Sequence, residues 1–256
     1  MTFSIITIAW NVADDLALTL ASVFAQSCKD FECIVQDGGS TDGTLAVAES
    51  FLPEGRLRIY SGKDAGIYDA MNRATAVSKG QWIIYLNAGD RFHDEGVLAR
   101  MQQQLQHCPP GIVYGNVLGQ YAGYQVTHRP ASMELLWLRK PYHHQAMFIA
   151  GDLARKNPFD LNFRIVADHE RACRLYHAGT PFAHVEELVA TVDMRGGVSK
   201  DRYVRTTLES MRVFRRHFFR WDREVRHWLH LGKLLVIKNL PEGLLSRLRR
   251  FKNRQR

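Results

Sequence analysis

The chain is poor in cysteine and has no long apolar segment. Its 256 residues include only 4 cysteines, and none of them forms a C-x-x-C pair, so we expect neither a disulfide framework nor a cysteine-ligated metal. No run of about eighteen uncharged apolar residues is present, which argues against a transmembrane helix. An apolar run starts directly after Met1 and leaves no room for a signal peptide. These absences favour a cytoplasmic protein with reduced thiols.

Acidic residues are scarce in the last part of the chain. Residues 200–256 hold 17 of the 34 Lys and Arg but only 5 of the 26 Asp and Glu, a formal charge of +12, and the rest carries −4. Apolar and aromatic residues accompany the basic ones at helical spacing, a pattern typical of helices on anionic membrane surfaces. Helices packed on a domain with a solvated basic face would give the same pattern. Charge alone also permits nucleic-acid binding, but no nucleic-acid motif is present, and we expect no such partner.

The first 110 residues alternate between strand and helix patterns. Four short apolar runs are strand candidates, at residues 3–9, 31–36, 57–60 and 82–86. Four runs with an apolar face or cap signals are helix candidates, at residues 14–26, 40–51, 66–79 and 94–107. This order predicts an α/β fold with a mostly parallel sheet flanked by helices.

The later residues are less regular. Strands are expected at 112–118, 124–127 and 182–192, with a helix at 168–177, and everything beyond residue 201 reads as helical. We therefore predict one α/β domain over residues 1–200 and a basic helical C-terminal extension over residues 201–256.

Polar residues follow three of the predicted strands. Thr7 and Asn11 close the first, the run DGGSTDGT at 37–44 follows the second, and NAGD at 87–90 follows the fourth. In open α/β sheets, ligands sit at the carboxyl ends of the strands. The sequence thus predicts one polar crevice, suited to a nucleotide-diphosphate compound.

The run at 37–44 resembles the D-G-S-x-D-G-T motif of family 2 glycosyltransferases, with one added glycine. With the other motifs, residues 2–200 are similar to this family, and more narrowly to bacterial enzymes that build capsular and colanic-acid-type exopolysaccharides. The resemblance implies a GT-A fold and transfer of a sugar, with inversion, from a nucleotide-diphosphate donor to an acceptor hydroxyl.

The same resemblance assigns the nucleoside site. It implies that Asp37 holds the nucleobase and that Thr7 and Asn11 contact the nucleoside. Gly38 and Gly39 permit close approach of the backbone to a ligand. An ordinary strand-to-helix turn is the alternative for these residues.

The segment KDAGIYDAMN at 63–72 is similar to a family segment that ends in A-R-N. Asp69 and Asn72 are three residues apart and share a helical face, which we expect to line the donor site; a solvated face is the alternative. Met71 replaces the family's Arg, so Lys63 and Arg73 are the candidates to contact the diphosphate instead.

The run at 87–90 stands where the family has a D-x-D metal motif. A divalent cation there would neutralise the leaving diphosphate, and Mg²⁺ or Mn²⁺ prefers oxygen ligands. Asn87 and Gly89 replace the family's acids, so Asp90 remains as the predicted metal ligand, and Asn87 and Asp90 as donor contacts. A helix N-cap is the alternative role for Asp90.

The run ADHE at 167–170 resembles the family's E-D-x-E element, with Ala167 in place of the first Glu. Asp168 matches the carboxylate that removes the proton from the acceptor hydroxyl. A helix N-cap is its alternative role, and His169, whose ordinary pKa is near neutrality, is an alternative base.

Two further segments complete the predicted site. His143, His144 and Gln145 match a family H-Q segment that implies acceptor or diphosphate contacts, with a structural His pair as the alternative. Arg195 and Lys200 flank a Gly-rich loop that we expect to close over the site and contact phosphate; a plain surface loop is the alternative.

These motifs predict an enzyme of bacterial exopolysaccharide or capsule synthesis. Its expected acceptor is an undecaprenyl-diphosphate-linked oligosaccharide, met at the cytoplasmic face of the inner membrane, where the basic tail would bind. Because Asn87 and Gly89 replace acids, a catalytically weak sugar-nucleotide-binding subunit of a polysaccharide assembly complex is the alternative. A basic RNA-binding protein is a third hypothesis.

Overall fold

A computed structural model describes the chain apart from residues 139, 195–202, 220–224, 226–227, 230–231 and 233–256. Its strands are β1 (Phe3–Ala9), β2 (Phe31–Asp37), β3 (Leu57–Ser61), β4 (Trp82–Tyr85), β5 (Arg91–Phe92), β6 (Ile112–Tyr121), β7 (Tyr124–His128), β8 (Met147–Ala150) and β9 (Phe182–Asp193). Its α-helices are α1 (Ala13–Phe24), α2 (Thr44–Ser50), α3 (Ile67–Val77), α4 (Val97–Leu105), α5 (Gly151–Lys156), α6 (Ala167–His177) and α8 (Tyr203–His217).

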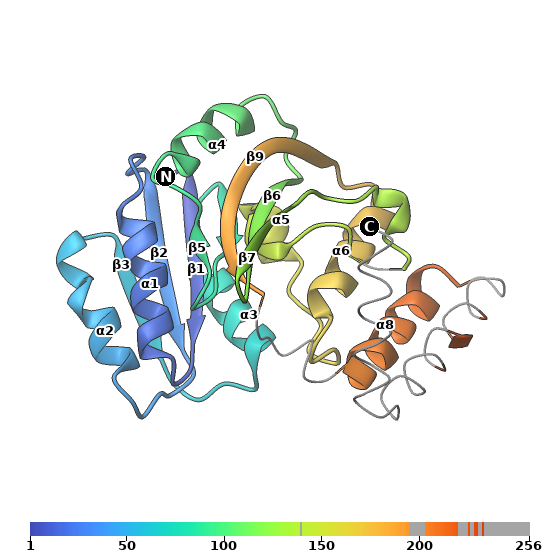
Figure 1. Cartoon of the computed structure of the whole chain (residues 1–256), viewed down its shortest axis with the longest axis horizontal. Coiled ribbons are helices and arrows are strands. Elements are labelled where there is room, and N and C mark those ends of the chain that lie inside the picture. Colours follow the sequence, from blue (N-terminus) through green and yellow to red (C-terminus); the bar gives the residue numbers. More distant parts are fainter. Residues whose placement is uncertain (139, 195–202, 220–224, 226–227, 230–231, 233–256) are drawn as a thin grey trace.

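The strands form one sheet in the order β3-β2-β1-β4-β8-β6-β9-β5, with β7 paired to β6 beside this path (Figure 1). The strands β1, β2, β3, β4, β6 and β9 run one way, and β5, β7 and β8 run the other. The predicted α/β class is confirmed, and the sheet is mixed, with the parallel strands β1 to β4 on one side and antiparallel pairs formed by β5, β7 and β8. Parallel pairs need crossover helices, and these cover the sheet.

The two faces of the sheet pack against different helices. Adjacent residues of a strand point to opposite faces, and Ile5 joins the core that includes Leu16 of α1 and Met101 of α4. Ile6 joins the other core, with Met71 of α3 and Cys173 of α6. Since both faces are covered, β1 and β2 are apolar along most of their length, which explains why the sequence showed continuous apolar runs instead of alternation.

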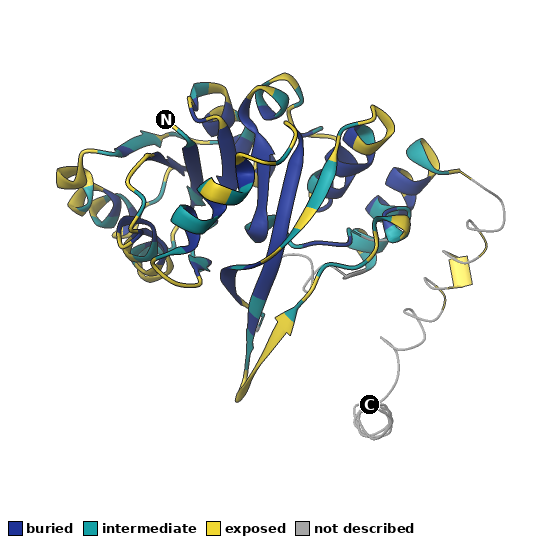
Figure 2. Ribbon diagram, turned by 90° about the horizontal axis from the view of Figure 1, so that it is seen from above, coloured by how far each residue is buried: buried dark blue, intermediate teal, exposed yellow. Residues whose placement is uncertain are grey.

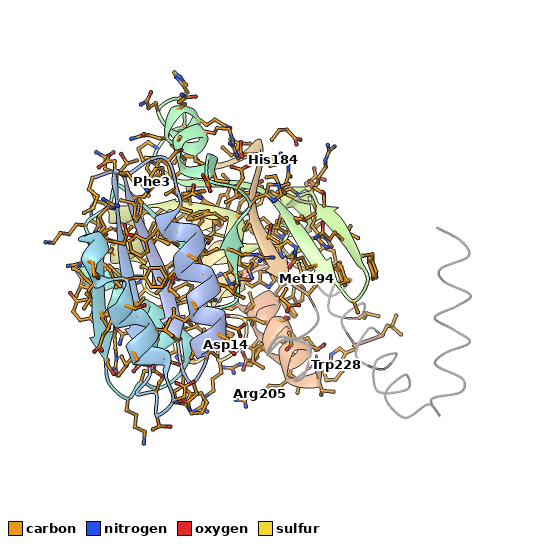
Figure 3. The ribbon with its side chains drawn as sticks, turned by 60° about the vertical axis from the view of Figure 1, so that its left-hand side comes forward. Phe3, Asp14, His184, Met194, Arg205 and Trp228 are labelled. Carbon is orange, nitrogen blue, oxygen red and sulfur yellow. The ribbon has the colours of Figure 1, made fainter. Side chains whose placement is uncertain are left out.

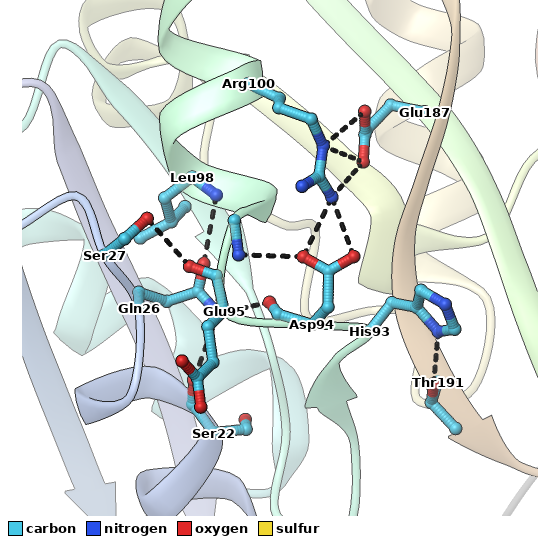
Figure 4. Close-up of polar contacts among 11 residues, drawn as sticks. Ser22, Gln26, Ser27, His93, Asp94, Glu95, Leu98, Arg100, Glu187 and Thr191 are labelled. Carbon is cyan, nitrogen blue, oxygen red and sulfur yellow. Dashed lines mark hydrogen bonds and ion pairs between the residues drawn. The ribbon is translucent and has the colours of Figure 1, made fainter.

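The connection after β4 is held by a polar network (Figure 4). Arg100 of α4 pairs with Glu187 of β9 at 2.8 Å and with Asp94 at 2.9 Å. The side chain of Gln26 accepts a hydrogen bond from the Leu98 amide at 3.0 Å and donates to the Asp94 carbonyl at 2.7 Å. This network anchors the chain that leaves the 87–90 turn.

Several predicted boundaries shift. The helix expected at 40–51 begins at Thr44, because residues 38–43 form a hydrogen-bonded loop on Asp37 and Asn11. The helix expected at 94–107 spans Val97–Leu105. The short strand β5 and the helix α5 were not predicted, because two and six residues carry too little periodicity to be recognised.

The first helix of the predicted extension packs on the α/β domain. Val213 and Phe214 of α8 are buried, α8 lies beside α6 (Figure 1), and the Glu209 carboxylate accepts a hydrogen bond from the Ile165 amide at 2.8 Å. The boundary at residue 200 stays a prediction. The rest of the basic tail lies mostly outside the described residues, and among those described no helix is long and apolar enough to cross a bilayer.

The β6–β7 hairpin projects from the body of the molecule (Figure 2). Four of the five residues of β7 are exposed. In Figure 3, Phe3 marks the start of β1, and Asp14 and Met194 lie toward the opposite end of the sheet, where the polar strand ends gather.

Candidate active site

The loops after β1 and β2 are tied together by Asn11. Its backbone is left-handed, with φ of 52°, its amide donates to the Ser40 hydroxyl at 2.8 Å, and its side-chain oxygen accepts from the Thr41 amide at 2.8 Å. Asn tolerates this conformation better than most residues. Asn11 therefore joins the two loops, with its side-chain oxygen engaged by the Thr41 amide, and its contact with a nucleoside stays a prediction.

Asp37 organises the Gly-rich turn from within. Its fully buried carboxylate accepts hydrogen bonds from the Gly39 amide at 3.0 Å and the Ser61 hydroxyl at 2.6 Å, and from both the amide and the hydroxyl of Ser40. Burial opposes ionisation, but these donors hold the pKa of Asp37 below its usual value. In this structure the carboxylate supports the turn and is not exposed to a nucleobase.

Thr7 does not face the crevice. Its side chain is fully buried, and its hydroxyl donates to the Leu86 carbonyl at 2.8 Å. This contact joins the end of β1 to the residue after β4. A direct contact with a nucleoside is not open to Thr7 in this structure, because the side chain has no exposed surface.

An exposed tryptophan and an aspartate lie beside Gly38. Trp10 is 67% exposed directly after β1, and a Cβ at Gly38 would stand 3.5 Å from Trp10 and 2.9 Å from a carboxylate oxygen of Asp64. An aromatic face next to a carboxylate can hold a heterocyclic base. Neither residue was among those expected at the site, although a large aromatic at the polar end of a buried strand was a signal.

The α3 residues serve the scaffold. The Asp69 carboxylate accepts from the Ala65 amide at 2.9 Å and pairs with Arg73 at 2.8 Å. The Asn72 amide group bonds both backbone groups of Phe159, at 2.8 and 3.0 Å. Asp69 and Asn72 thus lie on one helix, as expected, but their side chains bind neighbouring parts of the protein. Arg73, a candidate for the diphosphate, is paired with Asp69.

A tight turn follows β4. Gly89 adopts a positive φ of 94°, a conformation that favours glycine over the acid of the family motif. The Thr19 hydroxyl, from α1, accepts from the Gly89 amide at 3.0 Å and donates to the Asp90 carbonyl at 2.6 Å. Thr19 is therefore a positioning residue for this turn, and no sequence motif includes it.

Asp90 is a buried acid in an acidic neighbourhood. Its pKa is raised to about 7, chiefly by burial; the side-chain hydrogen bond from Gln145 opposes this rise, and the charges of Asp193 and Asp15 add to it. Two oxygens at this place, Asn87 Oδ1 and Gln145 Oε1, are buried without a hydrogen-bond partner. A group of oxygens with these properties favours a cation. Among the described residues, however, no cluster of three or more His, Cys, Asp or Glu could hold a metal.

His144 connects this turn to Asp168. Its Nε2 lies 3.3 Å from the Asn87 side-chain nitrogen, and its Nδ1 lies 3.6 Å from Asp168. Burial, reinforced by Lys140, lowers the pKa of His144 to about 3 and that of His143 to about 4, so both rings are neutral near pH 7. The predicted H-Q segment thus lies between the two predicted acidic sites.

Asp168 lies in the first turn of α6 and is held on two sides. One carboxylate oxygen accepts from the Tyr68 hydroxyl at 3.2 Å and from the His169 amide at 2.8 Å. The other pairs with Lys140. Burial opposes ionisation, but the positive charge of Lys140 holds the pKa of Asp168 well below its usual range. Lys140 was missed because no motif includes it.

His169 is turned away from this centre. Its Nε2 donates to the Leu136 carbonyl at 2.7 Å, and burial lowers its pKa. With Nε2 donating to this carbonyl, Nδ1 is the ring nitrogen left to accept a proton, and the assignment of His169 as an alternative base stays a prediction. Arg195 and Lys200 lie outside the described residues, and their predicted phosphate contacts stay predictions.

The comparisons with known proteins fit this geometry. The family model described as Glycosyl transferase family 2 matches residues 4–163, more than half of the chain. The chain belongs to glycosyltransferase family 2. The family resemblance stated from the motifs is therefore confirmed, and the protein is a glycosyltransferase.

Named relatives support the same assignment. The chain is 34% identical over 203 residues to a "PGL/p-HBAD biosynthesis glycosyltransferase" of Mycobacterium tuberculosis, covering 77% of this chain and 78% of the relative. It is 25% identical over 190 residues to the chondroitin synthase of Escherichia coli, covering 70% of this chain but 27% of that enzyme.

Solved structures show the fold. The S. aureus TarS 1–349 structure in complex with UDP-GlcNAc matches with a TM-score of 0.67 at 17% identity, covering 92% of this chain and 72% of that one. The mannosyltransferase PcManGT from Pyrobaculum calidifontis, in complex with GDP-Man and Mn²⁺, matches with a TM-score of 0.67 at 16% identity, covering 90% of this chain and 69% of that one. The predicted GT-A fold is confirmed.

Proposed function

We propose that this glycosyltransferase inverts the anomeric carbon of a nucleotide-diphosphate sugar and uses Asp168 as the base. The observation that carries the proposal is the chain of contacts from Asp168 through His144 to Asn87, with Gln145 on Asp90. These contacts bring a base candidate and a leaving-group site to one place.

The proposed step is a single displacement. The acceptor O–H bond breaks and its proton passes to Asp168, while the acceptor oxygen bonds to the anomeric carbon. The bond from that carbon to the diphosphate oxygen breaks, and the diphosphate leaves with the electron pair. Tyr68 and the His169 amide hold one carboxylate oxygen of Asp168. The other oxygen, which pairs with Lys140, is the one that would take the proton.

Lys140 has a part in this step. Paired with its ammonium, Asp168 is ionised at neutral pH but is a weak base. A donor diphosphate is a stronger attraction for an ammonium than one carboxylate. We infer that donor binding draws Lys140 toward the diphosphate and raises the basicity of Asp168 when the acceptor is to react.

The residues around Asp90 fit a divalent cation. Carboxylate and amide oxygens are the ligands that Mg²⁺ and Mn²⁺ prefer, and the unpartnered oxygens of Asn87 and Gln145 lie at the Asp90 turn. These three side chains would hold the ion, which when bound would neutralise charge on the leaving diphosphate. Asp90 provides the one carboxylate of the three.

For the donor we propose a UDP- or GDP-linked sugar held by Trp10, Asp64 and the 37–44 loop. The structural support of that loop would then come from Asp37, Gly38, Gly39 and Asn11. For the acceptor we propose a lipid-linked oligosaccharide of bacterial exopolysaccharide synthesis, reached from the cytoplasmic membrane face. The basic composition of residues 201–256 supports attachment to an anionic surface.

One observation favours the alternative of a catalytically weak binding subunit. Lys140 neutralises Asp168, and the acids expected at positions 87 and 89 are absent. Such a subunit would bind the donor without turning it over.

The test uses the full chain with a panel of UDP- and GDP-linked sugars, with and without MnCl₂. A ligand that binds only the folded state raises stability, by about 2.7 kcal/mol at a hundredfold excess over Kd. We expect one donor class to stabilise the protein and to be hydrolysed slowly. Stabilisation without hydrolysis or transfer would favour the binding subunit, and no stabilisation by any donor would refute both.

A further inference from the structure

The β6–β7 hairpin carries a row of rings that leads to the proposed base. The Tyr124 and Tyr121 rings stack at 4.8 Å with an interplanar angle of 4°. The Tyr121 hydroxyl lies 2.9 Å from His128 Nε2, and the His128 ring lies 5.4 Å from that of His143. We call Tyr124, Tyr121, His128 and His143 the aromatic row.

The inner end of the row adjoins the candidate active site along the chain. His143 directly precedes His144, whose ring nitrogen lies 3.6 Å from Asp168. The outer end is on the projecting hairpin, where Tyr124 is 59% exposed (Figure 2). The row therefore extends from the residue that precedes His144 to the exposed ring of Tyr124.

A glycine makes room for the row. In the β6–β7 register, Gly119 lies between Tyr121 and Val117, which faces His128. A Cβ at Gly119 would stand 2.7 Å from His128 Nε2 and 3.0 Å from Met194 Cγ. The His128 ring thus lies against the backbone of β6, close to the end of β9. A side chain at this position would push the ring out of the row.

The composition of the row indicates its ligand. An exposed face of a stacked tyrosine pair binds the C–H face of a pyranose ring, while hydroxyl and imidazole edges can bond sugar hydroxyls. A flat ring with an apolar face and hydroxyl edges therefore fits this surface.

We propose that the aromatic row is an acceptor subsite, in which Tyr124, backed by the Tyr121 ring, stacks on a sugar ring next to the one that receives the new sugar. The inference rests on the proposed function, because the acceptor hydroxyl must reach Asp168. It adds a substrate class: an acceptor of at least two sugar rings, bound along the hairpin.

The experiment compares acceptors and variants in one reaction. The full chain is given its donor, with methyl and p-nitrophenyl glycosides of one and two sugars as acceptors below saturation. Transfer and donor hydrolysis are measured together. For two-sugar acceptors, Tyr124→Ala should lower the ratio of transfer to hydrolysis by roughly fivefold to tenfold, the scale of one lost aromatic contact. Tyr124→Phe keeps the ring and should keep the ratio.

The matched control is Tyr176→Ala. Tyr176 is also a partly exposed tyrosine, at 42%, but its ring packs near Phe182 at the start of β9, away from Met194 at the other end. This variant should retain the wild-type ratio. If Tyr124→Ala stays within twofold of wild type for every acceptor, the subsite is refuted while the glycosyltransferase remains.

A binding measurement separates the inference from the proposed function. Saturation-transfer NMR without donor should show the two-sugar glycosides on the wild-type chain and a loss of signal in Tyr124→Ala. Absence of wild-type binding to every glycoside overturns the inference. Loss of binding to anionic phosphatidylglycerol vesicles in Tyr124→Ala, with the glycoside signals unchanged, would assign the hairpin to a membrane contact and also overturn it.

Discussion

The donor-side loops and the Asp168 region use their polar groups differently. After β1 and β2, nearly every predicted polar side chain is engaged within the protein: Asp37 by its own turn, Thr7 by a carbonyl, and Asn11 by the neighbouring loop. Around Asp168 and Asp90, the carboxylates are half-buried or buried beside a cation or other acids, and two nearby amide oxygens have no hydrogen-bond partner.

This difference separates scaffold from chemistry. A polar group that is already hydrogen-bonded within the protein holds a loop in place but has no free donor or acceptor for a substrate. A buried polar group without a partner is stabilised when a ligand supplies the missing contact. We therefore expect substitutions on the donor-side frame to change stability, and substitutions around Asp168 to change turnover.

The largest effect is expected for Asp168→Asn. The amide keeps the shape but cannot accept the acceptor proton, so transfer should fall by roughly 10²–10⁴-fold. Donor stabilisation in thermal shift should persist. The control is Asp152→Asn, which changes an exposed carboxylate on α5. Transfer near the wild-type rate in Asp168→Asn would exclude Asp168 as the base.

Asp90→Ala should abolish the strengthening of donor binding by Mn²⁺, since Asp90 is the one carboxylate among its proposed ligands. Donor titrations with MnCl₂ or EDTA measure this. Asp30→Asn, an exposed carboxylate hydrogen-bonded to Thr2 near the start of β1, is the control. Equal wild-type turnover in EDTA would show that the enzyme works without metal.

Asp90 also predicts a pH dependence of the metal-free protein. Because the folded state raises the Asp90 pKa from 3.8 to about 7, the folded protein holds a proton that the unfolded chain releases. In EDTA, the free energy of unfolding should fall between about pH 4 and 7, by on the order of a few kcal/mol, and level off above. Asp90→Asn should flatten that change in urea titrations. An unchanged slope in the variant would place its origin elsewhere.

Lys140→Met should shift the pH profile of kcat/KM. Without the ammonium, the Asp168 pKa rises toward its ordinary value, so the acidic limb should move to higher pH. Donor affinity should also weaken, because the ammonium is proposed to contact the diphosphate. A variant with an unmoved acidic limb and unchanged donor affinity would limit Lys140 to a structural ion pair.

The smallest effect is expected for Thr7→Val, which keeps the shape but removes the hydrogen bond to Leu86. We expect a loss of about 1 kcal/mol in the free energy of unfolding, with donor affinity unchanged. Urea titration and donor thermal shift measure the two quantities. If Thr7→Val weakened donor binding but left the free energy of unfolding unchanged, Thr7 would belong to the binding site, and the contrast between the two regions would not hold.

The sequence determined the frame of this protein. Short apolar runs that alternate with amphipathic ones admit few arrangements other than a mostly parallel sheet with helices on both faces, and polar residues after such strands must meet at one edge. Motifs such as DGGSTDGT and ADHE could therefore be placed in the family and at the site before the fold was known.

The tertiary structure decided what each polar residue does. Motifs are local, but a side chain's free capacity depends on partners distant in the chain: Leu86 for Thr7, Phe159 for Asn72, and Leu136 for His169. Lys140 reaches Asp168 across 28 residues, and the row from Tyr124 to His143 forms only when the hairpin folds back on the sheet. The spacing of residues within a motif does not predict such contacts, because burial and charge pairing depend on how the whole chain packs.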